Sequence, residues 1–274
     1  MTRATTETLA KAQRDRLQRF KTAECVDIHC HCLPGLDDGP PDEAAALQLC
    51  QALVADGVTT VIATPHQLGR FDGQVAADDI REAARRLNET LDARGVPLSV
   101  LPGADVRVDE RIPRLLDSDQ ILTLADERRY LLLEMPPETL FDIRPLLDDL
   151  ADRGVTPIIS HPERSVALRT RPEAVRGWLE RGALLQVTAA SLLGDFGPAP
   201  RRLAWHWLRT GEAALVASDA HDTDGRAPRA SAAIEAVARR LGTPAAHRAC
   251  IVNPLHVLAG KRIPSLPHRR RSRP

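Results

Sequence analysis

The sequence predicts an α/β protein, built as a distorted (β/α)7 barrel of the TIM type. Seven short apolar segments alternate with segments of helical periodicity along the 274 residues, a pattern typical of parallel strands connected by helices. The strand segments are continuously apolar, which indicates burial on both faces. A doubly wound open sheet is the alternative, but no glycine-rich fingerprint follows the first strand. A closed barrel with one unit fewer than eight is therefore favoured.

Each predicted strand is a run of β-branched or leucine residues followed by turn-forming or polar residues. The first lies around Val26 and Ile28 and opens into a loop that contains Gly35 and Gly39. The other strands are expected at residues 58–63, 98–101, 130–133, 156–160, 184–187 and 214–218.

The helices between these strands are indicated by apolar residues three and four positions apart, and by the glycine or proline residues that bound them. The first begins after Pro40 and Pro41, where acidic residues suit the positive end of a helix dipole. The helices are expected at residues 44–56, 80–91, 112–116, 143–153, 172–181, 201–209 and 229–241.

Composition indicates one cytoplasmic domain at residues 25–262, with a polar extension at 1–24 and a basic tail at 263–274. Acidic and basic residues balance at 37 each, so no net charge favours a nucleic-acid partner, and a basic tail is usually solvated. The five cysteines are odd in number and form no C-x-x-C pair, as expected of reduced thiols. No signal peptide or apolar run of ~20 residues is evident, so no membrane insertion is expected.

The stretch Asp27-Ile-His29-Cys-His31 carries the strongest chemical signal. Alternate side chains of a strand share a face, so Asp27, His29 and His31 are expected to project together while Cys30 points away. Two imidazoles with the carboxylate pair Asp37 and Asp38 a few residues later suit a divalent metal. The alternative is that the histidines only form hydrogen bonds at the end of a strand.

Six of the seven predicted strands end in a residue that can bind metal. Barrel enzymes build their sites at this rim, where so many imidazoles and carboxylates would stay unpaired without cations, so two or three ions are expected. Nitrogen and oxygen donors favour Mn²⁺, Fe²⁺ or Zn²⁺. Arg164 and Arg226 lie within reach and suit a phosphate, or else form surface salt bridges. The rim candidates are His29, His31, His66, Asp105, Glu134, His161, Asp219 and His221, whereas His206, His247, His256 and His268 are expected at the surface or in packing.

These motifs together resemble the PHP (polymerase and histidinol phosphatase) superfamily over about residues 25–260. Within it the chain is similar to the bacterial manganese-dependent protein-tyrosine phosphatases of capsule and exopolysaccharide operons. The motifs that carry the resemblance are Asp27-Ile-His-Cys-His31, Leu33-Pro-Gly-Leu-Asp-Asp-Gly39, Ala63-Thr-Pro-His66, Leu133-Glu134, Pro157-Ile-Ile-Ser-His-Pro-Glu-Arg164, Leu185-Gln-Val187, Ser191-Leu-Leu-Gly194, Ala217-Ser-Asp-Ala-His221 and Asn253-Pro254.

The resemblance implies a distorted (β/α)7 barrel that holds three metal ions. It implies that His29, His31 and Asp219 bind one ion and that Asp105 bridges to a second. Glu134 and His161 would complete the second site, and Asp38, His66 and His221 would hold the third. Arg164 and Arg226 resemble the phosphate-binding arginines of the family. Two departures stand out: the family usually has Glu where this chain has Asp105, and often a second histidine where Gln67 stands.

The implied function is hydrolysis of a phosphomonoester, with a phosphotyrosine-bearing bacterial tyrosine kinase that controls polysaccharide export as substrate. A tyrosyl leaving group has a pKa near ~10 and needs little proton assistance, so no general acid is assigned. Two alternatives stay open. One is a small-molecule phosphatase that acts on an ester such as histidinol phosphate. The other is a catalytically silent metal-binding regulatory module, which only Asp105 favours.

Overall fold

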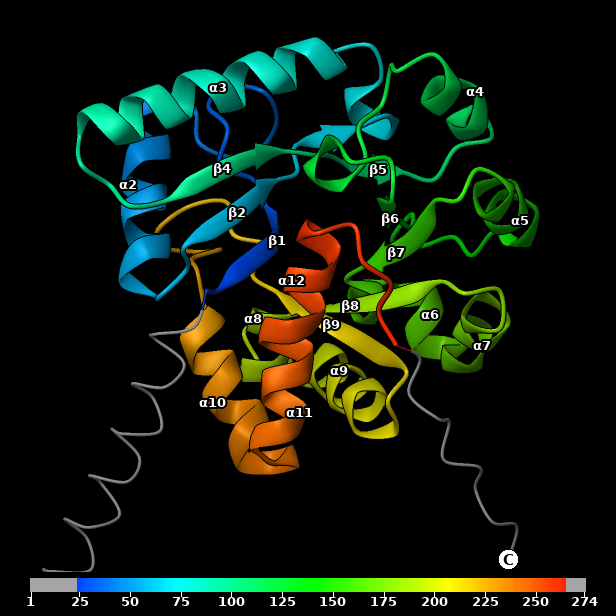
Figure 1. The fold of residues 1–274 in the computed structure, drawn as a ribbon. Coiled ribbons are helices and arrows are strands. Elements are labelled where there is room, and N and C mark those ends of the chain that lie inside the picture. Colours follow the sequence, from blue (N-terminus) through cyan, green and yellow to red (C-terminus); the bar gives the residue numbers. More distant parts are fainter. Residues whose placement is uncertain (1–23, 265–274) are drawn as a thin grey trace, which may run out of the picture.

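The computed structural model describes residues 24–264, which form a ring of parallel strands surrounded by helices (Figure 1). The predicted N-terminal extension and basic tail lie almost entirely outside these residues, so the proposed division into domains stays a prediction. The strands are β1 (Val26–Cys30), β2 (Thr60–Ala63), β3 (His66–Gln67), β4 (Ser99–Pro102), β5 (Asp105–Arg107), β6 (Tyr130–Glu134), β7 (Thr156–Ser160), β8 (Leu184–Thr188) and β9 (Ala213–Ala217).

These strands occupy seven positions around the barrel, because two of the predicted strands are interrupted. β2 continues as β3 after Thr64 and Pro65, and β4 continues as β5 after Gly103 and Ala104. A proline cannot donate to the sheet. At Gly103 a Cβ atom would lie 2.7 Å from the Ile62 side chain, so only glycine fits there. The predicted number of seven strand positions is correct. The two interruptions were not predicted.

Parallel pairing runs through the whole ring. The strand orders are β1-β2-β4 and β3-β5-β6-β7-β8-β9, and every pair is parallel. A single bridge between Cys30 and Ala220 links the end of β1 to the residues after β9, and Asp219 N–H donates to the His29 carbonyl at 2.8 Å. The barrel is therefore closed, and the open-sheet alternative is wrong.

Most of the helices lie around the outside of the barrel (Figure 1). Asp42 caps the first of them by accepting a hydrogen bond from the Ala45 N–H group. The helix expected at 172–181 is split into a 3-10 turn and a short α-helix. The helices are α2 (Glu43–Ala55), α3 (Ala77–Ala93), α4 (Ile112–Asp117), α5 (Arg144–Asp152), α6 (Val166–Thr170), α7 (Val175–Leu179), α8 (Ala189–Leu193), α9 (Pro198–Thr210), α10 (Ala230–Leu241), α11 (Thr243–His247) and α12 (Asn253–Leu258), with 3-10 turns η1 (Gly69–Phe71), η2 (Leu124–Asp126), η3 (Pro162–Arg164) and η4 (Pro172–Ala174) and the π-helical turn η5 (Arg248–Val252).

The amino-terminal end of the barrel is closed by α12, which lies across the centre of the ring in Figure 1. Tyr130, the first residue of β6, donates a hydrogen bond from its Oη to the Lys261 carbonyl at 2.6 Å. Val257 and Ile263 pack on the cluster inside the barrel. Because this end is closed, side chains that contact a substrate must lie at the carboxyl ends of the strands. The inner cluster takes Ile28, Ile62, Leu132, Ile158 and Leu215 from five different strands.

A larger cluster of buried apolar residues lies between the strands and the outer helices. Across residues 24–264, we find no helix with the length and apolar character needed to span a membrane.

Candidate metal centre

All nine predicted metal ligands meet at the carboxyl-terminal rim of the barrel. They form four overlapping groups, and within each group the candidate ligand atoms lie within 4.8 Å of one another. The parallel direction of the strands explains this, because it brings their carboxyl ends to one mouth. The groups are His31 with Asp38, His66 and His221; His29 with Asp105 and His161; His29 with His31 and Asp219; and His66 with Asp105 and Glu134.

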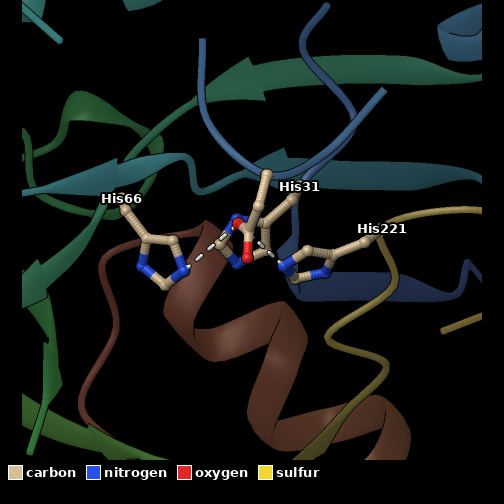
Figure 2. A group of neighbouring side chains, drawn as sticks. His31, His66 and His221 are labelled. Atoms are coloured by element: carbon tan, nitrogen blue, oxygen red, sulfur yellow. Dashed lines mark ion pairs between the residues drawn. The ribbon is translucent and has the colours of Figure 1, made fainter. Parts of the chain in front are cut away.

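Figure 2 shows the first of these groups, in which the side chains of His31, His66 and His221 lie close together. The His31 and His221 rings are stacked with centroids 3.8 Å apart. Asp38 Oδ1 lies 3.5 Å from His66 Nε2 and 3.4 Å from His221 Nε2. The three histidines and Asp38 therefore form one cluster, and are not separate residues at a strand end. The assignment of each residue to a particular ion stays a prediction.

Asp27 does not join the histidines, contrary to the alternation expected for β1. The register of β1 against β2 shifts between Asp27 and Cys30, as at a β-bulge, where one extra residue interrupts the alternation. The Asp27 carboxylate instead accepts hydrogen bonds from the backbone and hydroxyl of Ser218. Cys30 points away from the cluster as predicted, with its thiol donating to the Ala220 carbonyl.

Two residues outside the predicted ligand set orient the histidines, a role that was not predicted for either. Gln186 Oε1 lies 2.8 Å from His29 Nδ1, and Asp37 Oδ2 lies 2.5 Å from His31 Nδ1. Metal-binding histidines usually hold a partner on the second ring nitrogen in this way. The position of Gln186 near the end of β8 could have indicated it, whereas nothing in the sequence separates Asp37 from Asp38.

Gln67, for which the resemblance led us to expect a histidine, has its amide fully hydrogen-bonded away from the metal groups. Its Nε2 donates to the carbonyls of Val75 and Gln120 at 3.1 and 3.2 Å. Its Oε1 accepts from the Leu122 N–H group at 2.9 Å. Gln67 therefore holds a loop in place. Of the other histidines, His206, His247 and His256 lie outside the metal groups as expected, and His268 lies outside the described residues.

The rim residues fit divalent cations. Both carboxylate oxygens of Asp105, Oδ1 of Asp219 and Nε2 of His221 are buried without a hydrogen-bond partner, which is costly unless another group satisfies them. Burial, together with the charge of Asp105, raises the pKa of Glu134 to about 8. Burial also lowers the pKa of His31 and keeps its imidazole neutral, as a metal ligand must be.

Arg164 and Arg226 both contact Asp219 inside the rim, so neither is the surface salt bridge considered as an alternative. Arg226 Nη2 lies 2.7 Å from Asp219 Oδ2, and Arg164 Nη1 contacts the same oxygen. Burial alone raises the pKa of Asp219, but the charges of nearby histidines and both arginines hold it well below its usual range. Both arginines line a cavity of about 420 Å³ together with candidate metal ligands.

Two further features of the rim were not predicted. Arg107, two residues after Asp105 on β5, pairs with Glu134 at 2.8 Å and lines the same cavity. His161 and Asp219 adopt left-handed backbone conformations, with φ of 30° and 56°. Such strain in non-glycine residues is concentrated at functional sites. A closed parallel barrel with this cluster at its carboxyl rim defines a metal-dependent hydrolase.

The comparisons with known proteins identify the family. The family model described as "Capsular polysaccharide synthesis, CpsB/CapC" matches residues 25–259, and the chain belongs to this family. Tyrosine-protein phosphatase YwqE of Bacillus subtilis is 38% identical over 207 residues, covering 73% of this chain and 79% of the relative. Tyrosine-protein phosphatase CpsB of Streptococcus pneumoniae is 27% identical over 240 residues, covering 85% and 98%. The predicted resemblance is confirmed.

Solved structures agree with this assignment. A chain from the crystal structures of YwqE from Bacillus subtilis and CpsB from Streptococcus pneumoniae, described as unique metal-dependent tyrosine phosphatases, matches with a TM-score of 0.85 and 32% identity. That match covers 90% of this chain and 100% of the other. Organophosphorus hydrolase from Deinococcus radiodurans matches with a TM-score of 0.54 at 16% identity, covering 87% and 93%, and shows the fold alone. The predicted barrel fold is confirmed.

Proposed function

We propose that this protein is a metal-dependent protein-tyrosine phosphatase that acts on a phosphotyrosine protein of capsule or exopolysaccharide synthesis. The observation that carries the proposal is the pair Arg164 and Arg226 beside the metal cluster, in a cavity of about 420 Å³. Guanidinium groups bind phosphate oxygens bidentately. The relatives named as tyrosine-protein phosphatases support the same reaction and disfavour the two alternatives.

The nine rim residues would hold two or three ions, with Mn²⁺ proposed and Fe²⁺ or Zn²⁺ also suited to these donors. When bound, the ions supply the Lewis acidity that lowers the pKa of water and offsets phosphoryl charge. The side chains of the protein itself orient the metal ligands and the phosphoryl group. Gln186 and Asp37 fix the rings of His29 and His31, and the two arginines would donate to the phosphoryl oxygens as charge develops.

The substrate is proposed to be the phosphotyrosine-bearing tail of a bacterial tyrosine kinase that controls polysaccharide export. The family description in terms of capsular polysaccharide synthesis supports this. We propose that the protein acts in the cytoplasm, which the five free cysteines support.

A phosphatase assay across metals, with a phosphotyrosine peptide and histidinol phosphate in parallel, tests the proposal. We expect metal-dependent release of phosphate from the peptide, faster than from histidinol phosphate, and its loss in His161→Ala. Elemental analysis of the same preparations counts the ions. Full activity of His161→Ala or of the chelated protein would refute the mechanism. Bound metal without turnover of either ester would favour the silent module.

A further inference from the structure

We propose that Phe71 forms a subsite for the aromatic ring of the substrate and thereby makes the enzyme selective for aryl over alkyl phosphomonoesters. This inference rests on the proposed phosphatase function and concerns the same cavity. Phe71 would contact the tyrosyl ring of the substrate, whereas the metal ligands and the two arginines would contact the phosphoryl group.

The cavity has two chemically different parts. Arg164 and Arg226 supply positive charge beside the metal cluster, as a phosphoryl group requires. Five of the other lining residues are apolar and are not candidates for binding phosphate or metal. They are Leu68, Phe71, Met135, Pro137 and Pro162. A phosphotyrosine side chain has the same two parts, because its phosphoryl group is joined to its ring through one ester oxygen.

Phe71 lies directly beside the metal cluster. Its ring is stacked on that of His66, with centroids 5.4 Å apart and planes at 12°. His66 belongs to two of the four ligand groups. A substrate ring in contact with Phe71 would therefore lie next to the place where the phosphorus atom must be.

The Phe71 ring is also reachable from outside. The guanidinium carbon of Arg70 lies 4.6 Å from the ring centroid, and the Arg70 side chain is 62% exposed. Arg70 also pairs with Asp38, with Nη2 2.5 Å from Oδ2. This exposed side chain lies over the Phe71 ring, and an incoming aromatic ring would take its place by displacing it, since aromatic faces accept both cations and other rings.

The turn that carries Phe71 is rigidly held. Leu68 has a left-handed backbone with φ of 66°, and Gly69 follows with φ of 57°. A Cβ atom at Gly69 would lie only 3.0 Å from Arg107 Cγ, so the turn packs closely on Arg107. Arg107 is fixed in turn by Glu134 and by the Met135 carbonyl. A preorganised ring loses less freedom when a ligand binds.

A purely structural role for Phe71 makes a different prediction. If the ring only supports His66, its removal will weaken metal binding and slow every ester by the same factor. If the ring contacts the substrate, its removal will affect only esters that carry an aromatic group. Aromatic contacts of this kind change binding by roughly tenfold.

The test uses the full-length, metal-loaded protein and two peptides of identical sequence, one with phosphotyrosine and one with phosphoserine. The variants are Phe71→Ala, Phe71→Leu, which keeps apolar volume if the alanine variant folds poorly, and Phe141→Ala as a matched control. Phe141 is 50% exposed and is not among the residues that line the cavity. KM, kcat, peptide affinity by calorimetry and metal content are measured for each.

We expect Phe71→Ala to raise KM and the dissociation constant for the phosphotyrosine peptide roughly tenfold, with kcat, metal content and the values for phosphoserine within about twofold. Phe71→Leu should give a smaller change in the same direction, and Phe141→Ala none. Equal losses on both peptides, or loss of metal, would overturn the subsite. Failure of the wild-type protein to hydrolyse either peptide would refute the proposed function, while a calorimetric preference for phosphotyrosine that depends on Phe71 would still support the subsite.

Discussion

The two ends of the barrel differ in how their buried polar groups are satisfied. At the carboxyl rim, both oxygens of Asp105 and one of Asp219 are buried without a hydrogen-bond partner. At the amino-terminal end, Tyr130 Oη both donates to the Lys261 carbonyl and accepts from the Ile263 N–H group, and Asn253 donates to the Ala214 carbonyl at 2.7 Å. Each unsatisfied buried group costs about 1–3 kcal/mol. The rim is therefore built for ligands and the opposite end for stability.

Removal of the metal ions is the change expected to have the largest effect. Chelation should abolish phosphatase activity, because the rim then lacks the charge that its carboxylates and imidazoles are arranged to receive. It should also lower the melting temperature, since ligand at 100 times its dissociation constant stabilises by about 2.7 kcal/mol, or roughly 5–10 °C for a domain of this size. Activity and differential scanning calorimetry before and after re-addition of Mn²⁺ check both. An unchanged melting temperature would contradict the role given to the unpaired rim atoms.

The second largest effect is expected from a substitution in the interior of the barrel near its closed end. Ile263→Ala removes a buried side chain of the inner cluster at the closed end, and we expect a loss of about 2–5 kcal/mol in the free energy of unfolding. Urea denaturation measures it. The kcat of the folded, metal-loaded variant should stay within about twofold of wild type, because the substitution leaves the rim untouched. A large fall in kcat at full metal content would show that the two ends are coupled.

The third largest effect is expected from a substitution at the carboxyl-terminal rim. Arg164→Lys keeps the charge but loses the planar fork that binds phosphate bidentately, so kcat/KM should fall about 10–100-fold. Metal content should be unchanged. Arg181→Lys is the matched control, because Arg181 pairs with Asp148 at 3.2 Å away from the cavity-lining residues. Equal behaviour of the two variants would remove Arg164 from the phosphate site.

The barrel and eight of the nine candidate ligands could be predicted from sequence because they follow from strand periodicity and direction, whereas Asp38 lies in the loop after β1 and was indicated by the motif. Apolar runs mark buried strands, and parallel strands place their last residues at one mouth. The breaks at Pro65 and Gly103 could not be predicted in the same way, since the second depends on contact with Ile62 from a neighbouring strand.

The errors and omissions at the rim arise from features of the folded structure that sequence spacing does not specify. Asp27 was misplaced because a register shift in β1 interrupts the alternation. The roles of Asp37, Gln186 and Arg107 were not predicted because they come from contacts across the fold, with His31, His29 and Glu134. Sequence spacing locates the ends of strands, but it does not determine which polar side chains then contact one another.

The smallest predicted effect tests the hydrogen bonds of the closed end. Tyr130→Phe leaves the Lys261 carbonyl and the buried Ile263 N–H group without their partner, at a cost of about 1–2 kcal/mol in the free energy of unfolding, with kcat and metal content unchanged. Burial raises the pKa of Tyr130. The phenol's contribution is therefore complete below the pKa of an unfolded tyrosine, near ~10, and is lost as pH rises through the higher folded value. The stability difference between wild type and Tyr130→Phe should thus be constant from pH 7 to about 9 and shrink above about 10. Urea denaturation of both proteins across this range measures it, and a difference that widens at alkaline pH would contradict the buried, hydrogen-bonded phenol.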